Sequence, residues 1–136
     1  MCMCFSPDGT KLACGTGSSI RVYDVDTGTL ISESHQDWVN CVLWSRDGSR
    51  LFTGSANATI RCWNPDAGEQ IGRPWTAHTQ PILDLTLSPK GSTLASASWD
   101  KTVRFSPSGE FVASGGWGGK IYVWRVSRLN SITPIR

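Results

Sequence analysis

A short turn motif recurs along the chain at nearly regular intervals. Copies of Ser-x-x-Gly begin at Ser6, Ser45, Ser88 and Ser106. The first two intervals are 39 and 43 residues, whereas the third is only 18. A period of about 40 residues is long enough for one small unit of four short strands. The chain is therefore expected to be a row of similar β-units that bury apolar surface by stacking on one another.

The residues around each turn agree with this expectation. A small apolar run follows the turn, and a tight turn rich in Gly, Ser, Asn and Asp then leads into an alternating strand. Apolar positions before two of the turns indicate an inner strand, at residues 39, 42 and 44 and at residues 82, 85 and 87. The pattern predicts antiparallel four-stranded units joined by short turns, and hence an all-β fold.

Two segments carry a specific resemblance to a known family. Residues 51–64, LFTGSANATIRCWN, and residues 94–104, LASASWDKTVR, resemble the WD40 signature Leu-Ala-Ser-Gly-Ser-x-Asp-x-Thr-Ile-Arg-Leu-Trp-Asp. His35 and His78 stand at the family's Gly-His position, where Ser34 and Ala77 replace the glycine. The resemblance implies a partial WD40 β-propeller of about three four-stranded antiparallel blades. A propeller typically has 4 to 8 blades, so this chain alone is not expected to close the ring.

The repeat spacing also predicts the domain organisation. We expect a repeat domain over residues 1–126, followed by a C-terminal tail over 127–136. The repeat units are assigned to residues 1–34, 35–77, 78–104 and 105–126. Because the chain starts in mid-repeat and the third unit is short, it is interpreted as a fragment or an internally deleted member of the family. Assembly with copies of itself is one way in which a ring would be completed.

The third unit is interrupted after Arg104. Between Arg61 and Leu87 the chain advances 26 residues, but Phe105 follows Arg104 directly and the next Ser-Pro turn begins at once. About 25 residues are therefore missing relative to the preceding repeat. Residues 102–105 are either the third strand of their own blade, with 111–114 as its outer strand, or the inner strand of the final unit. The short connection favours the first arrangement, because it needs little loop closure.

Ser, His and Asp recur in a pattern that imitates a catalytic triad. The WD40 resemblance instead implies a structural tetrad, in which hydrogen bonds from His, Ser or Thr, Asp and Trp tie a loop to its blade. Buried polar groups need such partners, since an unsatisfied one costs about 1 to 3 kcal/mol. No repeat carries the complete set. The tetrad residues implied here are His35, Ser55, Asn57 and Trp63, then His78, Ser98 and Asp100, and finally Trp124.

The resemblance also implies where a protein partner binds. WD40 proteins use the loops before the inner strand and between the second and third strands. Trp is enriched among interface hot spots, which makes Trp at such positions informative. The alternative is that some of these Trp side chains pack between neighbouring blades. The partner-binding candidates are Trp38, Asn40, Leu83, Trp99 and Trp117.

Composition narrows the function classes. The net charge is only +2 and the 13 Lys and Arg residues are scattered, so nucleic acid is not expected as the main partner. Five cysteines in apolar surroundings indicate reduced core thiols, and the Cys2 and Cys4 pair lacks the second ligand pair that a zinc site needs. Neither metal nor cofactor is expected.

The absence of a signal sequence and of an apolar run of about 20 residues predicts a cytoplasmic protein, with the nucleus as a second location. The predicted function is a non-catalytic protein-interaction scaffold, not an enzyme. The alternatives are a truncated or non-functional WD40 fragment, a nucleic-acid-binding propeller and a propeller enzyme.

Overall fold

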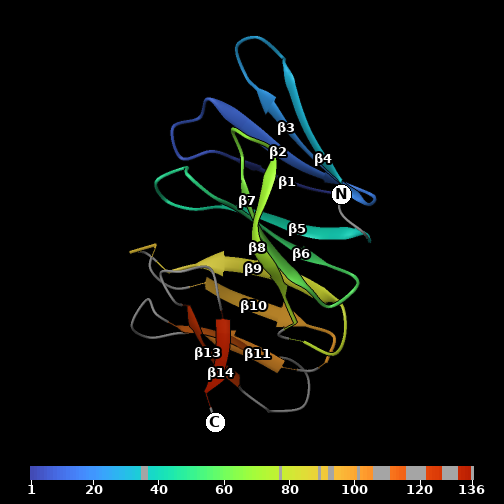
Figure 1. Ribbon diagram of the computed structural model, residues 1–136, viewed down its shortest axis with the longest axis vertical. Coiled ribbons are helices and arrows are strands. Elements are labelled where there is room, and N and C mark those ends of the chain that lie inside the picture. Colours follow the sequence, from blue (N-terminus) through green and yellow to red (C-terminus); the bar gives the residue numbers. More distant parts are fainter. Residues whose placement is uncertain are drawn as a thin grey trace.

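The chain folds into three β-sheets that follow one another along its longest dimension (Figure 1). The computed structural model describes residues 1–34, 37–76, 78–88, 90–91, 94–100, 102–105, 111–115, 122–126 and 132–135. Side-chain burial is described for residues 1–30 and, with the same gaps, for 37–100. All regular elements in the described ranges are strands, and none of these ranges contains a helix long and apolar enough to cross a membrane.

The first two sheets each contain four antiparallel strands in chain order. The first sheet is formed by β1 (Cys2–Phe5), β2 (Lys11–Thr16), β3 (Ser19–Asp24) and β4 (Leu30–Ser34). The second is formed by β5 (Val39–Trp44), β6 (Leu51–Ser55), β7 (Ile60–Asn64) and β8 (Glu69–Trp75). These two sheets have the expected architecture of propeller blades.

The third sheet is larger than a four-stranded blade. Its strands are β9 (Ile82–Leu87), β10 (Leu94–Ser98), β11 (Thr102–Phe105), β12 (Phe111–Gly115), β13 (Tyr122–Val126) and β14 (Ile132–Ile135). β11 pairs with both β10 and β12. Residues 102–105 are therefore the third strand of their own blade with residues 111–114 beside them, which is the first of the two arrangements considered above. The final unit therefore continues the third sheet, and β14, within the segment expected to be a tail, pairs with the free edge of β13.

The recurring turn is held by the same hydrogen bonds in the first two sheets. Ser6 Oγ donates to Asp8 Oδ1 at 2.6 Å, and the Lys11 backbone N–H donates to Ser6 Oγ at 2.9 Å. Ser45 and Asp47 repeat the first of these bonds at 2.6 Å. The glycine that ends each turn has a positive φ, which an L side chain rarely adopts. The Ser-x-x-Gly spacing thus reflects a single local structure that reverses the chain between two strands.

Apolar clusters fill the spaces between neighbouring sheets. The cluster between the first and second sheets joins Ile20 and Val22 to Val42, Trp44 and other buried residues. A second cluster lies between the second and third sheets. The three sheets form an open series with the first and third at its two ends, so the ring of a complete propeller is not closed by this chain (Figure 1).

Candidate functional site

A buried polar cluster ties the loop before β9 to the third sheet. His78 Nδ1 lies 2.6 Å from Asp100 Oδ2, and His78 Nε2 lies 3.0 Å from Ser96 Oγ. The His78 side chain is completely buried and that of Asp100 is 6% exposed. The Thr79 backbone N–H also donates to Asp100 Oδ2, at 3.3 Å. The Ser96 hydroxyl and the His78 imidazole are both buried, and their hydrogen bonds join the loop before β9 to β10 and to the turn that follows it.

The structure corrects one member of this cluster. Ser98 was expected to bond to His78, but Ser96 occupies that position two residues earlier on β10. A bulge between Ala97 and Ser98 alters the register with β9, and Ser98 Oγ donates instead to the Gln80 carbonyl at 2.9 Å. Ser98 Oγ also accepts from the Asp100 backbone N–H at 3.2 Å. The second serine of the motif therefore organises the turn, while the first contacts the histidine.

The second sheet shows the same shift of position. Trp63 Nε1 donates to Thr53 Oγ1 at 2.9 Å, and both side chains are buried, so Thr53 replaces the expected Ser55. Asn57 Oδ1 accepts from the Thr59 backbone N–H and hydroxyl, at 3.1 and 2.6 Å. The predicted His35 lies outside the described residues. Trp124 lies in β13, and its side chain is likewise outside the described part.

Three of the five partner-binding candidates are exposed. Trp38 and Trp99 are each 68% exposed, and Leu83 is 47% exposed. Asn40 is only half-buried, and its Nδ2 donates to the Ile82 carbonyl of the third sheet at 2.7 Å. Asn40 therefore has a bridging role in addition to any contact with a partner. Trp117 lies outside the described residues.

Backbone hydrogen bonds place the exposed candidates at the same end of the sheets. The Ala56 N–H donates to the Trp38 carbonyl at 2.8 Å, and in the third sheet the Trp99 N–H donates to the Pro81 carbonyl at 3.0 Å. Each bond joins the loop before an inner strand to the turn between the second and third strands. We call the surface formed by residues 37–40, 55–58, 79–83 and 98–100 the loop end.

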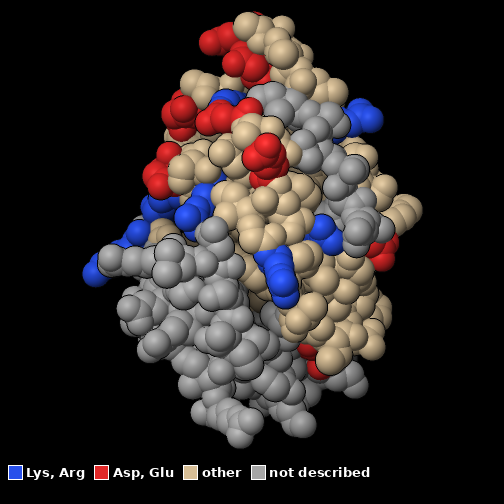
Figure 2. All heavy atoms as spheres, in the orientation of Figure 1, with Lys and Arg blue, Asp and Glu red and all other residues tan. Residues whose placement is uncertain are grey.

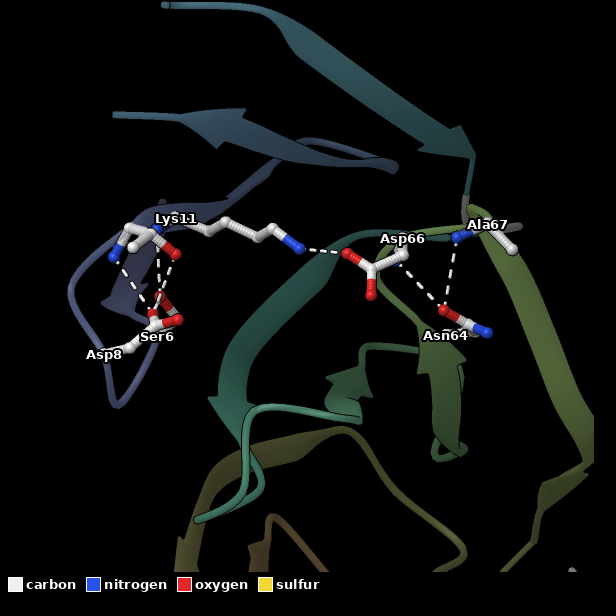
Figure 3. A network of polar contacts seen from close by, with 7 residues as sticks. Ser6, Asp8, Lys11, Asn64, Asp66 and Ala67 are labelled. Carbon is white, nitrogen blue, oxygen red and sulfur yellow. Dashed lines mark hydrogen bonds and ion pairs between the residues drawn. The ribbon is translucent and has the colours of Figure 1, made fainter. Parts of the chain in front are cut away.

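Further polar contacts link neighbouring sheets at the opposite end. Lys11 of β2 forms an ion pair with Asp66, which follows β7 (Figure 3). Arg46 Nε donates to the Ser88 carbonyl at 3.1 Å, which links the second turn to the third. The ion pair is exposed on the Asp66 side and is expected to contribute little stability. No motif in the sequence indicated these contacts, because the residues are far apart in the chain.

The five cysteines are free thiols, of which Cys14, Cys41 and Cys62 are buried and Cys2 and Cys4 are half-buried. Burial raises the pKa of Cys41 to about 12 and that of Cys62 to about 11, so both thiols remain protonated at neutral pH. Within the described ranges no group of three His, Cys, Asp or Glu side chains is placed to hold a metal ion.

Comparisons with known proteins agree with the architecture. The family description "WD domain, G-beta repeat" matches residues 1–24, 27–64, 68–105 and 102–125, so the last two matches share residues 102–105. The mouse intraflagellar transport protein 122 homolog is 32% identical over 88% of this chain and 10% of its own length. Bovine WD repeat-containing protein 18 is 30% identical, over 83% of this chain and 29% of its own length.

The target of rapamycin complex subunit wat1 of Schizosaccharomyces pombe is 25% identical over 91% of this chain and 48% of its own length. The chain spans about a tenth of the intraflagellar transport relatives that it matches. Because repeat matches cover most of the chain and its sheets have the order expected of blades, the chain belongs to the WD40-repeat family.

Proposed function

We propose that this chain is a non-catalytic protein-interaction module that binds a protein partner at the loop end. The observation that carries the proposal is the exposure of Trp38, Leu83 and Trp99 on this one surface. Large apolar side chains are costly to leave in water, and Trp is the residue type most enriched among interface hot spots. The names of two relatives, a target of rapamycin complex subunit and a COMPASS component, describe members of protein assemblies.

Charge favours a protein over a nucleic acid as the partner. Asp37 and Asp84 adjoin Trp38 and Leu83 in the sequence, and Asp84 is exposed. On the face drawn in Figure 2, acidic side chains gather over the first sheet, away from the loop end, and Lys and Arg side chains lie singly or in small groups. A phosphate backbone would need a continuous basic surface. We expect the partner to present an apolar segment flanked by basic residues, in the cytoplasm or the nucleus.

Two further partner classes remain as alternatives. A nucleic acid would stack its bases on Trp38 and Trp99, and its affinity would fall steeply with salt. A copy of this chain would associate through an uncovered sheet. A truncated product without function is the remaining alternative, and it predicts no specific partner at the loop end.

The test is site-specific photo-crosslinking in cells, followed by binding measurements with the purified partner. A photoreactive residue at position 38 or 99 is expected to capture one protein that the same residue at position 25 does not capture. Val25 is a suitable control because it is 48% exposed and lies in a turn of the first sheet.

The variants Trp38→Ala and Trp99→Ala are then expected to weaken binding of that partner by at least about 10-fold each, because hot-spot truncations cost more than about 1.4 kcal/mol. The triple variant that adds Trp117→Ala should bind more weakly still. Circular dichroism must show that each variant is folded. Unchanged affinity in the folded triple variant would refute the assignment of the loop end.

A further inference from the structure

Trp99 lies in the middle of a turn whose residues are bonded one after another to the loop before β9. The Trp99 backbone N–H donates to the Pro81 carbonyl at 3.0 Å. One residue earlier, Ser98 Oγ donates to the Gln80 carbonyl at 2.9 Å. The backbone that leads from β10 into Trp99 is therefore fixed at two successive residues, although Trp99 itself is 68% exposed.

The residue after Trp99 completes this attachment. Asp100 Oδ2 accepts from the Thr79 backbone N–H at 3.3 Å and lies 2.6 Å from His78 Nδ1. The Asp100 side chain is 6% exposed and that of His78 is completely buried, so water competes little for these bonds. The exposed Trp99 is thus flanked on both sides by hydrogen bonds to the same loop.

The equivalent turn of the second sheet is built differently. Asn57 stands where the third sheet has Asp100, as the pairing of the preceding strands shows. Asn57 Oδ1 accepts from the N–H and the hydroxyl of Thr59, two residues further along the same turn. Among the described residues, no side chain of this turn bonds to the loop before β5, which carries Trp38. Of these two sheets, the third alone therefore has side-chain links from its turn to the loop, and they surround Trp99.

We propose that His78 and Asp100 are positioning residues for partner binding, because their buried pair holds the Trp99 backbone in the conformation that contacts the partner. This inference rests on the function proposed above. Ordering a loop or a side chain on binding costs free energy, and a residue that is already held in place avoids most of that cost. Trp99 is the fixed anchor of the loop end, whereas Trp38 contacts the partner without depending on the pair.

Amide hydrogen exchange of the Trp99 N–H measures this positioning without a partner. Isotope-labelled tryptophan gives one backbone signal for each of the 7 Trp residues, and Trp→Phe variants assign these signals. Asp100→Ala is expected to accelerate exchange of the Trp99 N–H by at least about 10-fold more than exchange of the Trp63 N–H, which reports on the second sheet. Asp100→Asn should restore most of the protection, because one amide oxygen can accept both bonds that reach Asp100 Oδ2.

Two further variants keep this measurement decisive. Asn57→Ala is the matched control, since it removes the side chain at the equivalent position of the second sheet and should leave Trp99 exchange unchanged. Ser96→Ala is a milder change than Asp100→Ala, because it removes only the hydroxyl that lies 3.0 Å from His78 Nε2. It should loosen the histidine and accelerate Trp99 exchange by at least about 3-fold. Unchanged Trp99 exchange in the folded variants, or an acceleration that Trp63 shares in full, would overturn the proposal.

A double-mutant cycle tests the binding step with the protein captured by crosslinking from position 99. Asp100→Ala, or Ser96→Ala in its place, is expected to weaken binding of this protein about 5-fold. In a Trp99→Ala background the same change should have no further effect, because the side chain that the pair positions is gone. Equal weakening in both backgrounds would overturn the proposal, since it would mean that the pair acts through another part of the loop end.

The two measurements separate this inference from the proposed function. If no protein is captured at the loop end, the proposed function fails, while the exchange data still decide whether His78 and Asp100 hold Trp99. If a protein is captured but Trp99 exchange does not respond to Asp100→Ala or Ser96→Ala, the positioning role alone is refuted.

Discussion

Gly54 lies in β6 where the second and third sheets approach each other closely. A Cβ on this residue would lie 2.5 Å from Cys41 Sγ and 2.5 Å from Ile82 Cγ2. Cys41 is the cross-strand partner of Gly54, whereas Ile82 belongs to the third sheet, and all three residues are buried. Ordinary carbon contacts are about 3.5 to 4.0 Å. The variant Gly54→Ala therefore requires the third sheet to move by about 1 Å.

The expected cost follows from two opposed effects. The backbone of Gly54 does not have a positive φ, so alanine fits its conformation and reduces the entropy of the unfolded chain, which stabilises the fold by about 0.4 to 1 kcal/mol. Overpacking a well-filled core costs about 1 to 3 kcal/mol. Because the Cβ of Ile82 also lies within 3.0 Å, rotation of its side chain does not relieve the contact. We expect a net loss of about 1 to 2 kcal/mol in the free energy of unfolding.

Urea unfolding followed by tryptophan fluorescence measures this loss. Gly15→Ala is expected to have the same sign, because its Cβ would lie 2.6 Å from Cys2 Sγ and 2.8 Å from Val39 Cγ1. The double variant Gly54→Ala, Ile82→Ala should lose less stability than the sum of its two single variants, since removal of the Ile82 side chain beyond Cβ eliminates one of the two 2.5 Å contacts. A Gly54→Ala variant that is as stable as the parent, or more stable, would refute the close approach of the sheets.

Three further predictions concern polar groups. Asp100→Ala removes the acceptor of the buried His78 ring and should lower the free energy of unfolding by about 3 kcal/mol in urea titrations, with a smaller loss for Asp100→Asn. Trp63→Phe leaves the buried Thr53 hydroxyl without its indole donor and should cost about 1 to 2 kcal/mol by the same measurement. Hydrogen bonds from hydroxyl and backbone groups of its turn lower the pKa of Asp47 from 3.8 to about 2. Its stabilising effect is complete above about pH 5 and is lost as the pH falls through about 2, so acid unfolding curves of Asp47→Asn should change less over this range than those of the parent chain.

The architecture was predictable from the sequence because it rests on local turns. The serine and glycine of the first two turns have the same roles, and the spacing of 39 and 43 residues between the first three turns sets the length of a unit. The extent of the third sheet was not predictable in the same way. An alternating strand such as β13 satisfies its hydrogen bonds equally well at the edge of an existing sheet or in a separate one.

The polar cluster was predictable only in part. The WD40 resemblance correctly brought His78 and Asp100 together, but it assigned the hydroxyl to Ser98 instead of Ser96. Both serines lie on β10 and are buried, but Ser96 Oγ lies 3.0 Å from His78 Nε2, whereas Ser98 Oγ donates to the Gln80 carbonyl. The two hydroxyl positions lie two residues apart on one strand in both sheets, and each suits a buried hydroxyl, so the sequence alone did not separate them.

The loop end owes its geometry to contacts between sheets more than to the loops themselves. The bond from Asn40 Nδ2 to the Ile82 carbonyl joins β5 directly to β9, next to the exposed Leu83. Trp38 precedes the same β5 by one residue, and its carbonyl is fixed by the turn after β6. The side chains of Trp38 and Leu83, 45 positions apart in the chain, are thereby both attached to the rigid frame that β5 and β9 form. Because few groups then need to become ordered on binding, this frame should favour tight association at the loop end.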